Sequence, residues 1–229
     1  MMKRPSWIHS ALSLLLCLPL LVSCARSTTA SVPAGCAQAS SPCLTGKATV
    51  QMTTNRGAIT LEINGDAAPV TAGNFVDLVK RGIYNGTVFH RVVREPVPFV
   101  VQGGDPASSD PKTPKNSYGT GSFVDPATGQ ARFIPLEVKF RGEDQPRYSR
   151  VSTNPSDLLQ IELAHERGAL AMARSQAPDS ASAQFYIALR PLPELDGRYA
   201  VFGRVTQGMD VVDAIQQDDK IIKAELLKP

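Results

Sequence analysis

The chain has 229 residues, of which 42% are hydrophobic and 20% charged, and its formal net charge at pH 7 is +3. Two of its basic residues, Lys3 and Arg4, precede an N-terminal apolar run, and without them positive and negative charges nearly balance. This balance excludes the strongly basic surface that binds nucleic acid, and the length suits one domain with a full core rather than two.

Residues 1–23 have the three parts of a secretory signal: a basic start, an apolar core at residues 11–22 and small residues at the exit. The core is shorter than the roughly 20 apolar residues that a transmembrane helix needs. The motif Leu-Val-Ser-Cys, which ends at Cys24, is similar to a bacterial lipobox, in which the cysteine is acylated. We therefore expect an exported, membrane-anchored lipoprotein with lipid (palmitate) on Cys24. The alternative is an ordinary cleaved signal with a chance cysteine.

The cysteine count agrees with this interpretation. Of four cysteines, Cys17 leaves with the signal and Cys24 takes the lipid, so Cys36 and Cys43 remain as an even pair. In an oxidising compartment they could form a small disulfide loop, and the alternative is two free thiols in a flexible segment, because sequence alone does not show geometry. The three histidines do not cluster with cysteines at metal-ligand spacing, so we expect no metal.

Residues 24–46 are dominated by Ser, Thr, Ala, Pro and Gly, with few side chains able to build a core. This composition predicts a flexible tether that holds the following domain, residues 47–229, off the membrane.

The domain opens with apolar residues that alternate with polar ones on both sides of a turn at residues 55–57, which predicts a β-hairpin with one buried face. A helix follows, with Thr71 as a candidate N-cap and Gly82 as the C-terminal stop. Its core-facing side is predicted from helical spacing to contain Ala72, Phe75, Val76 and Val79.

The stretch from residue 89 to residue 105 (FHRVVREPVPFVVQGGD) contains two apolar runs suited to buried strands. Each run carries one long polar side chain, Arg91 in the first and Gln102 in the second. An unpaired charge inside an apolar strand is costly, so such a conflict favours a functional role. The alternative is an arginine at a strand edge whose head group reaches water.

The later elements are predicted from shorter patterns. A Gly-Thr-Gly sequence at residues 119–121 is interpreted as a turn, since no Lys-Ser/Thr of a phosphate loop follows it. Further along we predict a strand through Leu136, Val138 and Phe140, a helical turn at residues 155–162, strands at residues 168–173, 184–189 and 221–227, and a second short helix with Met209, Val212 and Ile215.

Four motifs stand in one order along the chain: residues 89–105, then GALAMA at 168–173, SAQFYI at 182–187 and LDGRYAVFG at 195–203. Together they resemble the signature of the cyclophilins, which are peptidyl-prolyl cis-trans isomerases. The resemblance covers roughly residues 47–227. It implies a mainly β fold, a closed eight-stranded antiparallel barrel capped by two helices, which here follows the flexible N-terminal tether.

By this resemblance Arg91 and Gln102 are the catalytic residues: Arg91 donates to the prolyl nitrogen, while Gln102 binds the substrate carbonyl or orients Arg91. The turn at residues 119–121 borders the groove. The resemblance assigns substrate binding to Phe99, Val100, Ala173, Arg174, Gln184, Tyr186, Leu195 and Tyr199. It implies proline-containing polypeptide clients and no cofactor. Without Arg91 and Gln102 beside them, the apolar members would be interpreted as ordinary core.

Three residues depart from the family pattern. Glu194 stands where many members have Trp, Tyr199 replaces His, and Arg174 occupies a position often held by Asn. A carboxylate in place of the indole wall predicts weak cyclosporin binding. This variant is similar to cyclophilins of photosynthetic bacteria and thylakoid lumens, some of which act as assembly factors.

Two hypotheses follow. The first is an active prolyl isomerase that assists folding of exported or membrane proteins, and it is favoured because both Arg91 and Gln102 are present. The second is a catalytically weak cyclophilin-fold binding module for assembly of membrane complexes. Glu194 favours the second, as does the segment at residues 105–168, which is long enough to contain an insertion. That insertion is either a partner-specific surface or a tolerated surface loop. We expect a monomer.

Overall fold

The computed structural model describes residues 2, 34–39 and 41–228. The predicted signal, apart from Met2, and the predicted lipidation site Cys24 lie outside these residues. From residue 34 onward the described chain belongs to one compact unit. Its helices are α1 (Ala34–Gln38), α2 (Pro69–Lys80), α3 (Pro155–Leu158) and α4 (Met209–Ala214), and its 3₁₀ turns are η1 (Pro106–Ser109), η2 (Lys115–Ser117) and η3 (Pro193–Leu195). Among the described residues, no helix is long and apolar enough to cross a membrane.

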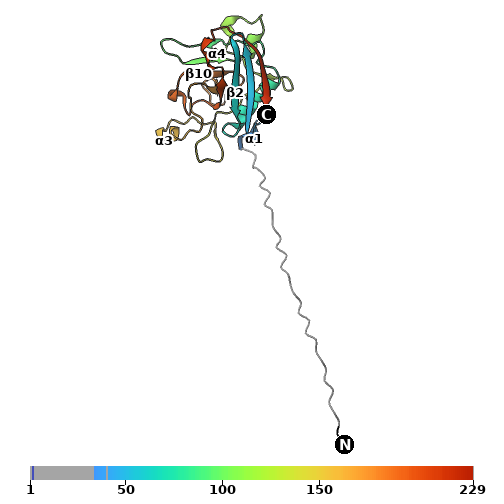
Figure 1. Ribbon diagram of the computed structural model, residues 1–229. Helices are drawn as coiled ribbons and strands as arrows, with labels where there is room; N and C mark the ends of the chain where they lie inside the picture. Colours follow the sequence, from blue (N-terminus) through green and yellow to red (C-terminus); the bar gives the residue numbers. More distant parts are fainter. Residues whose placement is uncertain (1, 3–33, 40, 229) are drawn as a thin grey trace. The chain divides into compact units, whose positions relative to one another are not determined.

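The main sheet has eight antiparallel strands. They are β1 (Lys47–Thr54), β2 (Gly57–Asn64), β3 (Arg91–Val92), β4 (Val100–Gly103), β9 (Ala169–Met172), β10 (Phe185–Ala188), β11 (Val201–Gln207) and β12 (Ile221–Lys228). Their order across the sheet is β12-β1-β2-β11-β9-β10-β4-β3. Figure 1 shows β1 and β2 as long neighbours, with the red C-terminal strand β12 beside them. The predicted mainly β fold and the predicted hairpin around residues 55–57 are confirmed.

The edge strands of this sheet, β12 and β3, are not joined by a ladder. The residues just before them do meet, because the Phe89 N–H donates to the Asp219 carbonyl (2.8 Å) and the Asp218 N–H donates to the Phe89 carbonyl (2.9 Å). The sheet is thus a curled half-barrel whose two edges approach through a few backbone hydrogen bonds. The closed barrel expected from the sequence is not shown.

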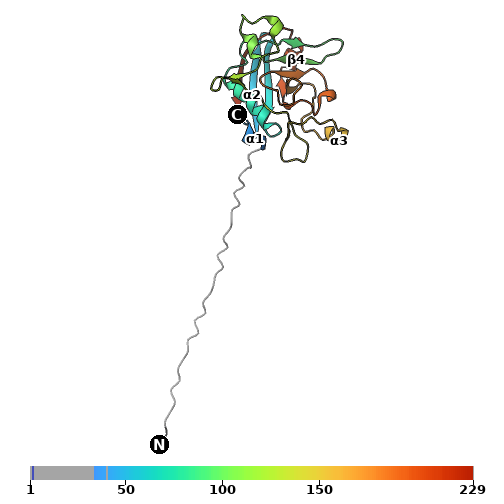
Figure 2. The same ribbon diagram turned by 180° about the vertical axis from the view of Figure 1, so that it is seen from behind.

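The core lies between the curled sheet and α2, which is seen across the sheet in Figure 2 and contacts β2, β11 and β12. Phe75 of α2 is fully buried. Its ring centroid lies 5.0 Å from that of Tyr84, 5.6 Å from that of Phe185 and 5.0 Å from that of Phe202. The apolar face predicted for this helix is confirmed, and so is the second short helix, α4, which contacts β2.

The start of α2 differs from the prediction. The helix begins at Pro69, and Thr71 does not cap it. Instead the buried Glu137 carboxylate accepts hydrogen bonds from the N–H groups of Val70 (3.2 Å) and Thr71 (2.9 Å). A carboxylate suits a helix N-terminus, where free N–H groups and the helix dipole favour negative charge. Burial raises the pKa of Glu137, and the hydrogen bonds from the helix oppose that rise.

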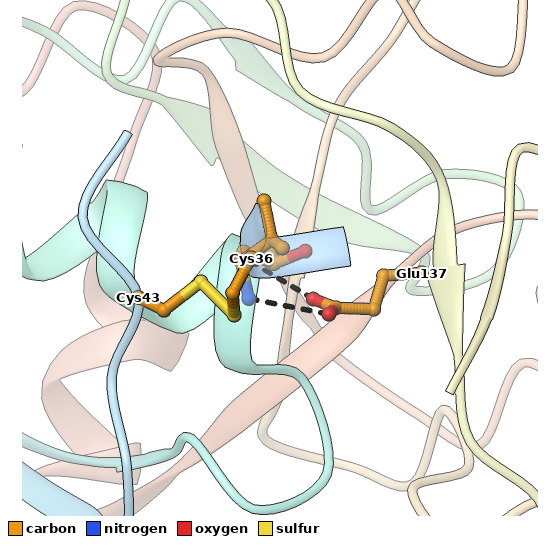
Figure 3. Close-up of a disulfide and its surroundings, with 5 residues drawn as sticks. Cys36, Cys43 and Glu137 are labelled. Atoms are coloured by element: carbon orange, nitrogen blue, oxygen red, sulfur yellow. Dashed lines mark hydrogen bonds between the residues drawn. A yellow bond between two sulfur atoms is a disulfide. The ribbon is translucent and has the colours of Figure 1, made fainter. Parts of the chain in front are cut away.

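A disulfide joins Cys36 of α1 to Cys43 beside the start of α2, close to Glu137 (Figure 3). The Leu44 N–H donates to the Pro69 carbonyl (3.0 Å). Gly73 permits this approach, since a Cβ at that position would lie 2.0 Å from the Pro42 carbonyl oxygen.

This arrangement corrects part of the prediction for residues 24–46. Cys36, Ala39, Cys43 and Leu44 pack against the main core. The described residues of this segment are therefore packed on the domain, and the folded unit begins before residue 47.

The predicted insertion at residues 105–168 forms small elements of its own. Two short ribbons lie in it, β5 (Val124–Asp125) with β6 (Gln130–Ala131) and β7 (Glu137–Val138) with β8 (Arg147–Tyr148). The apolar residues predicted as a strand pack with Ile161 and Ala200 in a separate small core that contains Leu136, Val138 and Phe140. The strand itself is shorter than predicted, and Phe140 pairs with Ile161 in an isolated bridge.

We predict that Glu137→Ala lowers the free energy of unfolding by about 2–3 kcal/mol, because the N–H groups of Val70 and Thr71 lose their buried acceptor. Chemical denaturation monitored by circular dichroism measures the change. Glu166→Ala, at an exposed loop residue, is the matched control and should change stability by less than about 0.5 kcal/mol. Equal effects of the two substitutions would contradict the capping role.

Candidate active site

Three neighbouring strands bring the predicted site residues into one row. Arg91 of β3 lies opposite Gln102 of β4, and Gln102 lies opposite Tyr186 of β10. Directly opposed residues of antiparallel strands point to the same face of the sheet. The register therefore puts a guanidinium, an amide and a phenol side by side, although Tyr186 is far from the other two in sequence.

Hydrogen bonds link the polar members of this row. Arg91 Nη1 donates to Gln102 Oε1 (3.3 Å), and Gln102 Nε2 donates to Gln184 Oε1 (3.2 Å). Gln184 Nε2 in turn donates to the carbonyls of Gly119 (3.0 Å) and Gly121 (2.9 Å). Gln102 and Gln184 thus connect Arg91 to the turn at residues 119–121.

The turn at residues 119–121 is also held by Asp105, which is fully buried. Its carboxylate accepts hydrogen bonds from the N–H groups of Gly119 (2.6 Å) and Gly121 (3.2 Å). A Cβ at Gly121 would lie only 2.1 Å from Asp105 Oδ1, so this close approach requires glycine. The predicted turn is thus present, and its anchor, Asp105, is a residue whose role the sequence did not indicate.

Arg91 is solvent-exposed on an edge strand, so its charge is not buried as the apolar sequence around it suggested. Its guanidinium carbon lies 5.8 Å from the centroid of the Phe99 ring. The exposure of Arg91 therefore agrees with the alternative interpretation, an arginine at a strand edge whose head group reaches water. Because the side chain is exposed, a ligand beside Phe99 and Gln102 can reach guanidinium N–H groups other than the one bonded to Gln102.

The predicted apolar residues form one cluster beside Arg91. Its buried part includes Val100, Tyr186 and Val201. Partly buried around them are Phe99, Leu163, Ala173, Leu195 and Tyr199. The rings of Tyr186 and Tyr199 meet edge to face with centroids 5.9 Å apart. Partly buried apolar side chains at the edge of a core make a surface that can hold a small apolar ring.

Arg174 lies at the rim and is engaged by the protein itself. Its Nε and Nη2 donate to the Arg198 carbonyl at 2.9 and 2.6 Å, and its guanidinium lies 4.7 Å from the centroid of the Tyr199 ring. It therefore braces Tyr199. Arg174 also lines a hollow of about 360 Å³ together with Gln102, Gln184, the turn at residues 119–121 and Phe133.

Two residues of this region were not predicted as part of the site, His165 and Asp196. His165 is buried, its Nδ1 lies 2.7 Å from Asp196 Oδ1, and its Nε2 lies 2.9 Å from the Tyr186 hydroxyl. Burial raises the pKa of Tyr186 well above its usual range. In sequence His165 is only a histidine near an apolar run, and nothing in that pattern indicates a link to Asp196 or Tyr186.

Two further residues near the site, Glu194 and His90, have shifted pKa values. Glu194 is exposed and pairs with Arg190 (2.8 Å), and its own backbone N–H together with that guanidinium lowers the pKa of its carboxyl. Burial lowers the pKa of His90, whose ring lies against Gly119. This favours a neutral, structural His90.

The sequence matches, over residues 49–227, the family described as cyclophilin type peptidyl-prolyl cis-trans isomerase/CLD. It is 38% identical over 197 residues to a Synechocystis protein whose name describes a thylakoid lumen peptidyl-prolyl cis-trans isomerase, a match that covers 81% of this chain and 48% of that relative. It is 34% identical over 171 residues to a peptidyl-prolyl cis-trans isomerase of Acinetobacter baylyi, covering 72% of this chain and 70% of that relative. The chain thus spans about half the length of the Synechocystis relative.

The fold is similar to solved structures. A cyclophilin type peptidyl-prolyl cis-trans isomerase of Cryptosporidium parvum aligns with a TM-score of 0.58 at 23% identity and covers 80% of this chain and 99% of its own. The same protein solved in the presence of the dipeptide Ala-Pro aligns with a TM-score of 0.57 at 24% identity, covering 79% of this chain and 99% of its own. At this identity the likeness shows the fold.

We predict that Gln184→Ala increases amide hydrogen exchange in residues 117–122 about tenfold, because the turn loses both hydrogen bonds from the Gln184 side chain, which directly precedes β10. Exchange measured by mass spectrometry at peptide resolution tests this. Gln207→Ala, an exposed glutamine at the end of β11, is the control and should leave the same peptide unchanged. Unchanged exchange in the Gln184 variant would mean that Asp105 alone holds the turn.

Proposed function

The chain belongs to the cyclophilin-type peptidyl-prolyl cis-trans isomerases, and on that premise we propose that it catalyses rotation about Xaa-Pro bonds in polypeptide clients, with Arg91 as the donor to the prolyl nitrogen. The observation that carries the proposal is the position of Arg91. Its exposed guanidinium is tied to Gln102 at the edge of an apolar cluster that contains Phe99, Leu195 and Tyr199.

The chemistry needs a donor and an apolar surface. Amide resonance gives the Xaa-Pro bond double-bond character and a rotation barrier of about 20 kcal/mol. A hydrogen bond to the prolyl nitrogen favours a pyramidal nitrogen, which no longer conjugates with the carbonyl. Lowering the barrier by about 5.5 kcal/mol accelerates rotation roughly 10⁴-fold. Arg91 suits this role because a guanidinium is always charged and presents several N–H groups in a fixed plane.

The remaining residues hold the substrate. In this proposal the proline ring packs on Phe99, Val100, Ala173, Tyr186, Leu195 and Tyr199, with Arg174 bracing the last of these. Gln102 and Gln184 face the peptide on its polar side, where the hollow of about 360 Å³ continues from the site toward Phe133. The relative solved in the presence of Ala-Pro supports a proline-containing ligand for this fold.

We also propose an extracytoplasmic location. The name of the Synechocystis relative and the disulfide between Cys36 and Cys43 both support it, since disulfides persist in oxidising compartments. Anchoring through a lipid on Cys24, and a role in folding of exported or membrane proteins, rest on the sequence pattern of the N-terminal segment.

A specific observation favours a second candidate, a catalytically weak binding module for assembly of membrane complexes. Glu194 is directed to Arg190 rather than supplying an apolar wall beside Leu195. A rim of charged residues covers a proline ring less completely than an indole would. The hydrogen-bonded link between Arg91 and Gln102 supports the enzyme instead, because a pure binding module needs no donor at the prolyl nitrogen.

We predict that Arg91→Ala lowers kcat/KM for a short Xaa-Pro peptide by about 10²–10³-fold, the usual loss when one charge-stabilising donor is removed. A coupled isomerisation assay on the chain without its predicted signal measures this. Arg150→Ala, at an exposed arginine of the insertion, is the matched control and should retain full activity. A folded wild type without turnover would refute the enzyme and leave the binding module.

We predict that the wild type binds cyclosporin weakly and that Glu194→Trp increases the affinity at least tenfold, because an indole adds an apolar wall beside Leu195. Isothermal titration calorimetry measures both affinities. Asp210→Trp, a similar change at an exposed position of α4 away from the site, controls for nonspecific adsorption. If the Glu194 variant binds no better, the weak binding has another cause, and the rim residues Arg174 and Tyr199 become the ones to replace.

A further inference from the structure

A buried chain of hydrogen bonds lies beneath the proposed proline pocket. His165 is 2% exposed and Tyr186 is 5% exposed. Asp196 Oδ1 lies 2.8 Å from the His165 backbone nitrogen and 2.7 Å from its Nδ1, and His165 Nε2 lies 2.9 Å from the Tyr186 hydroxyl. The imidazole and phenol rings are nearly parallel, at 11°, with centroids 6.0 Å apart. The three side chains thus form one continuous link.

The direction of these hydrogen bonds follows from the donors present. A carboxylate only accepts, so Asp196 receives both the backbone N–H and the Nδ1–H of His165. This tautomer leaves Nε2 as an acceptor, and the Tyr186 O–H donates to it. Burial raises the pKa of Tyr186, so its hydroxyl keeps the proton that this bond needs. Both ring nitrogens of His165 and the Tyr186 hydroxyl are thus paired within the link.

His165 also holds the turn that carries Leu195. Its N–H donates to Asp196, and its carbonyl accepts from the Leu192 N–H (2.8 Å). Leu192 and Asp196 flank η3, the turn that presents Leu195 to the pocket. The backbone of His165 therefore fixes one wall of the pocket, and its side chain fixes Tyr186, which comes from β10.

A purely apolar site would not need this arrangement. A phenylalanine at position 186 would fill the same volume, whereas a buried hydroxyl is costly unless it is paired. The pairing restricts the Tyr186 ring to one orientation, in edge contact with Tyr199. Groups behind a binding site commonly hold the contacting side chains in a fixed geometry in this way.

We propose that His165 and Asp196 are positioning residues that set the distance between the Tyr186 floor and the Leu195 wall, and so make the pocket selective for the five-membered proline ring. The inference rests on the proposed function, since it concerns the same pocket. Neither residue touches the substrate, and both act through Tyr186 and Leu195.

The test compares a prolyl peptide with the same peptide containing pipecolic acid, whose ring has six members. For wild type, His165→Leu, His165→Gln and Tyr186→Phe, NMR titration of the chain without its predicted signal gives the dissociation constant of each peptide. A coupled assay gives kcat and KM. Thermal unfolding confirms that each variant is folded at the assay temperature.

We expect His165→Leu to raise KM for the prolyl peptide about tenfold, with a smaller change in kcat, and to reduce the preference for proline over pipecolic acid at least fivefold. His165→Gln keeps an acceptor for the Tyr186 hydroxyl and should restore most of the preference. Tyr186→Phe removes only the hydroxyl and should reduce the preference at least threefold. It serves as the second variant where His165→Leu does not fold.

Variants that are less stable but keep the wild-type preference would overturn the inference, because His165 would then serve only the core. The binding data separate this failure from failure of the proposed function. A wild type that binds the peptides without turning them over refutes the isomerase, while its binding ratios still decide the role of His165. A wild type that binds neither peptide overturns both.

Discussion

The site depends on the register of β3, β4 and β10. This register aligns Arg91, Gln102 and Tyr186 across three strands, of which β10 is far from β3 and β4 in sequence. Because side chains alternate between the faces of a strand, a slip of one residue in β4 would turn Gln102 to the opposite face and break the link to Arg91. The curled sheet therefore does more than enclose a core, since its pairing fixes which polar groups meet the apolar cluster.

Acidic side chains that are buried or nearly buried hold the segments outside the strands in place. Asp105 binds the N–H groups of the turn at residues 119–121, Glu137 binds the first N–H groups of α2, and Asp196 binds His165. Each carboxylate is largely removed from water, so leaving it unpaired would be costly. Its partner segment is consequently held in one conformation. Loops with little apolar content thereby acquire defined positions around the sheet.

The sequence predicted well those features that depend on neighbours along the chain. The alternation around residues 55–57 and the helical spacing through Phe75 locate the hairpin and α2, and the four ordered motifs locate Arg91 and Gln102. The cap of α2 could not be predicted, because Glu137 lies in a distant ribbon. The packing of Cys36 and Cys43 on the domain was also missed, since it depends on a close backbone approach at Gly73 rather than on apolar composition.

In the proposed mechanism, the exposure of Arg91 makes its action as a donor depend on the pocket beside it. A guanidinium in water is well solvated, and its interaction with a prolyl nitrogen gains strength only as water leaves the site. In the proposed mechanism, the group that displaces the water is the proline ring, which would settle on Phe99, Tyr186 and Leu195. In that mechanism the action of the donor would depend on how closely the ring fits, and a pocket whose floor is held by hydrogen bonds would give the same fit at each turnover. With Glu194 contributing no apolar wall, the fit rests on the remaining faces, which makes the link from Asp196 through His165 to Tyr186 the more important.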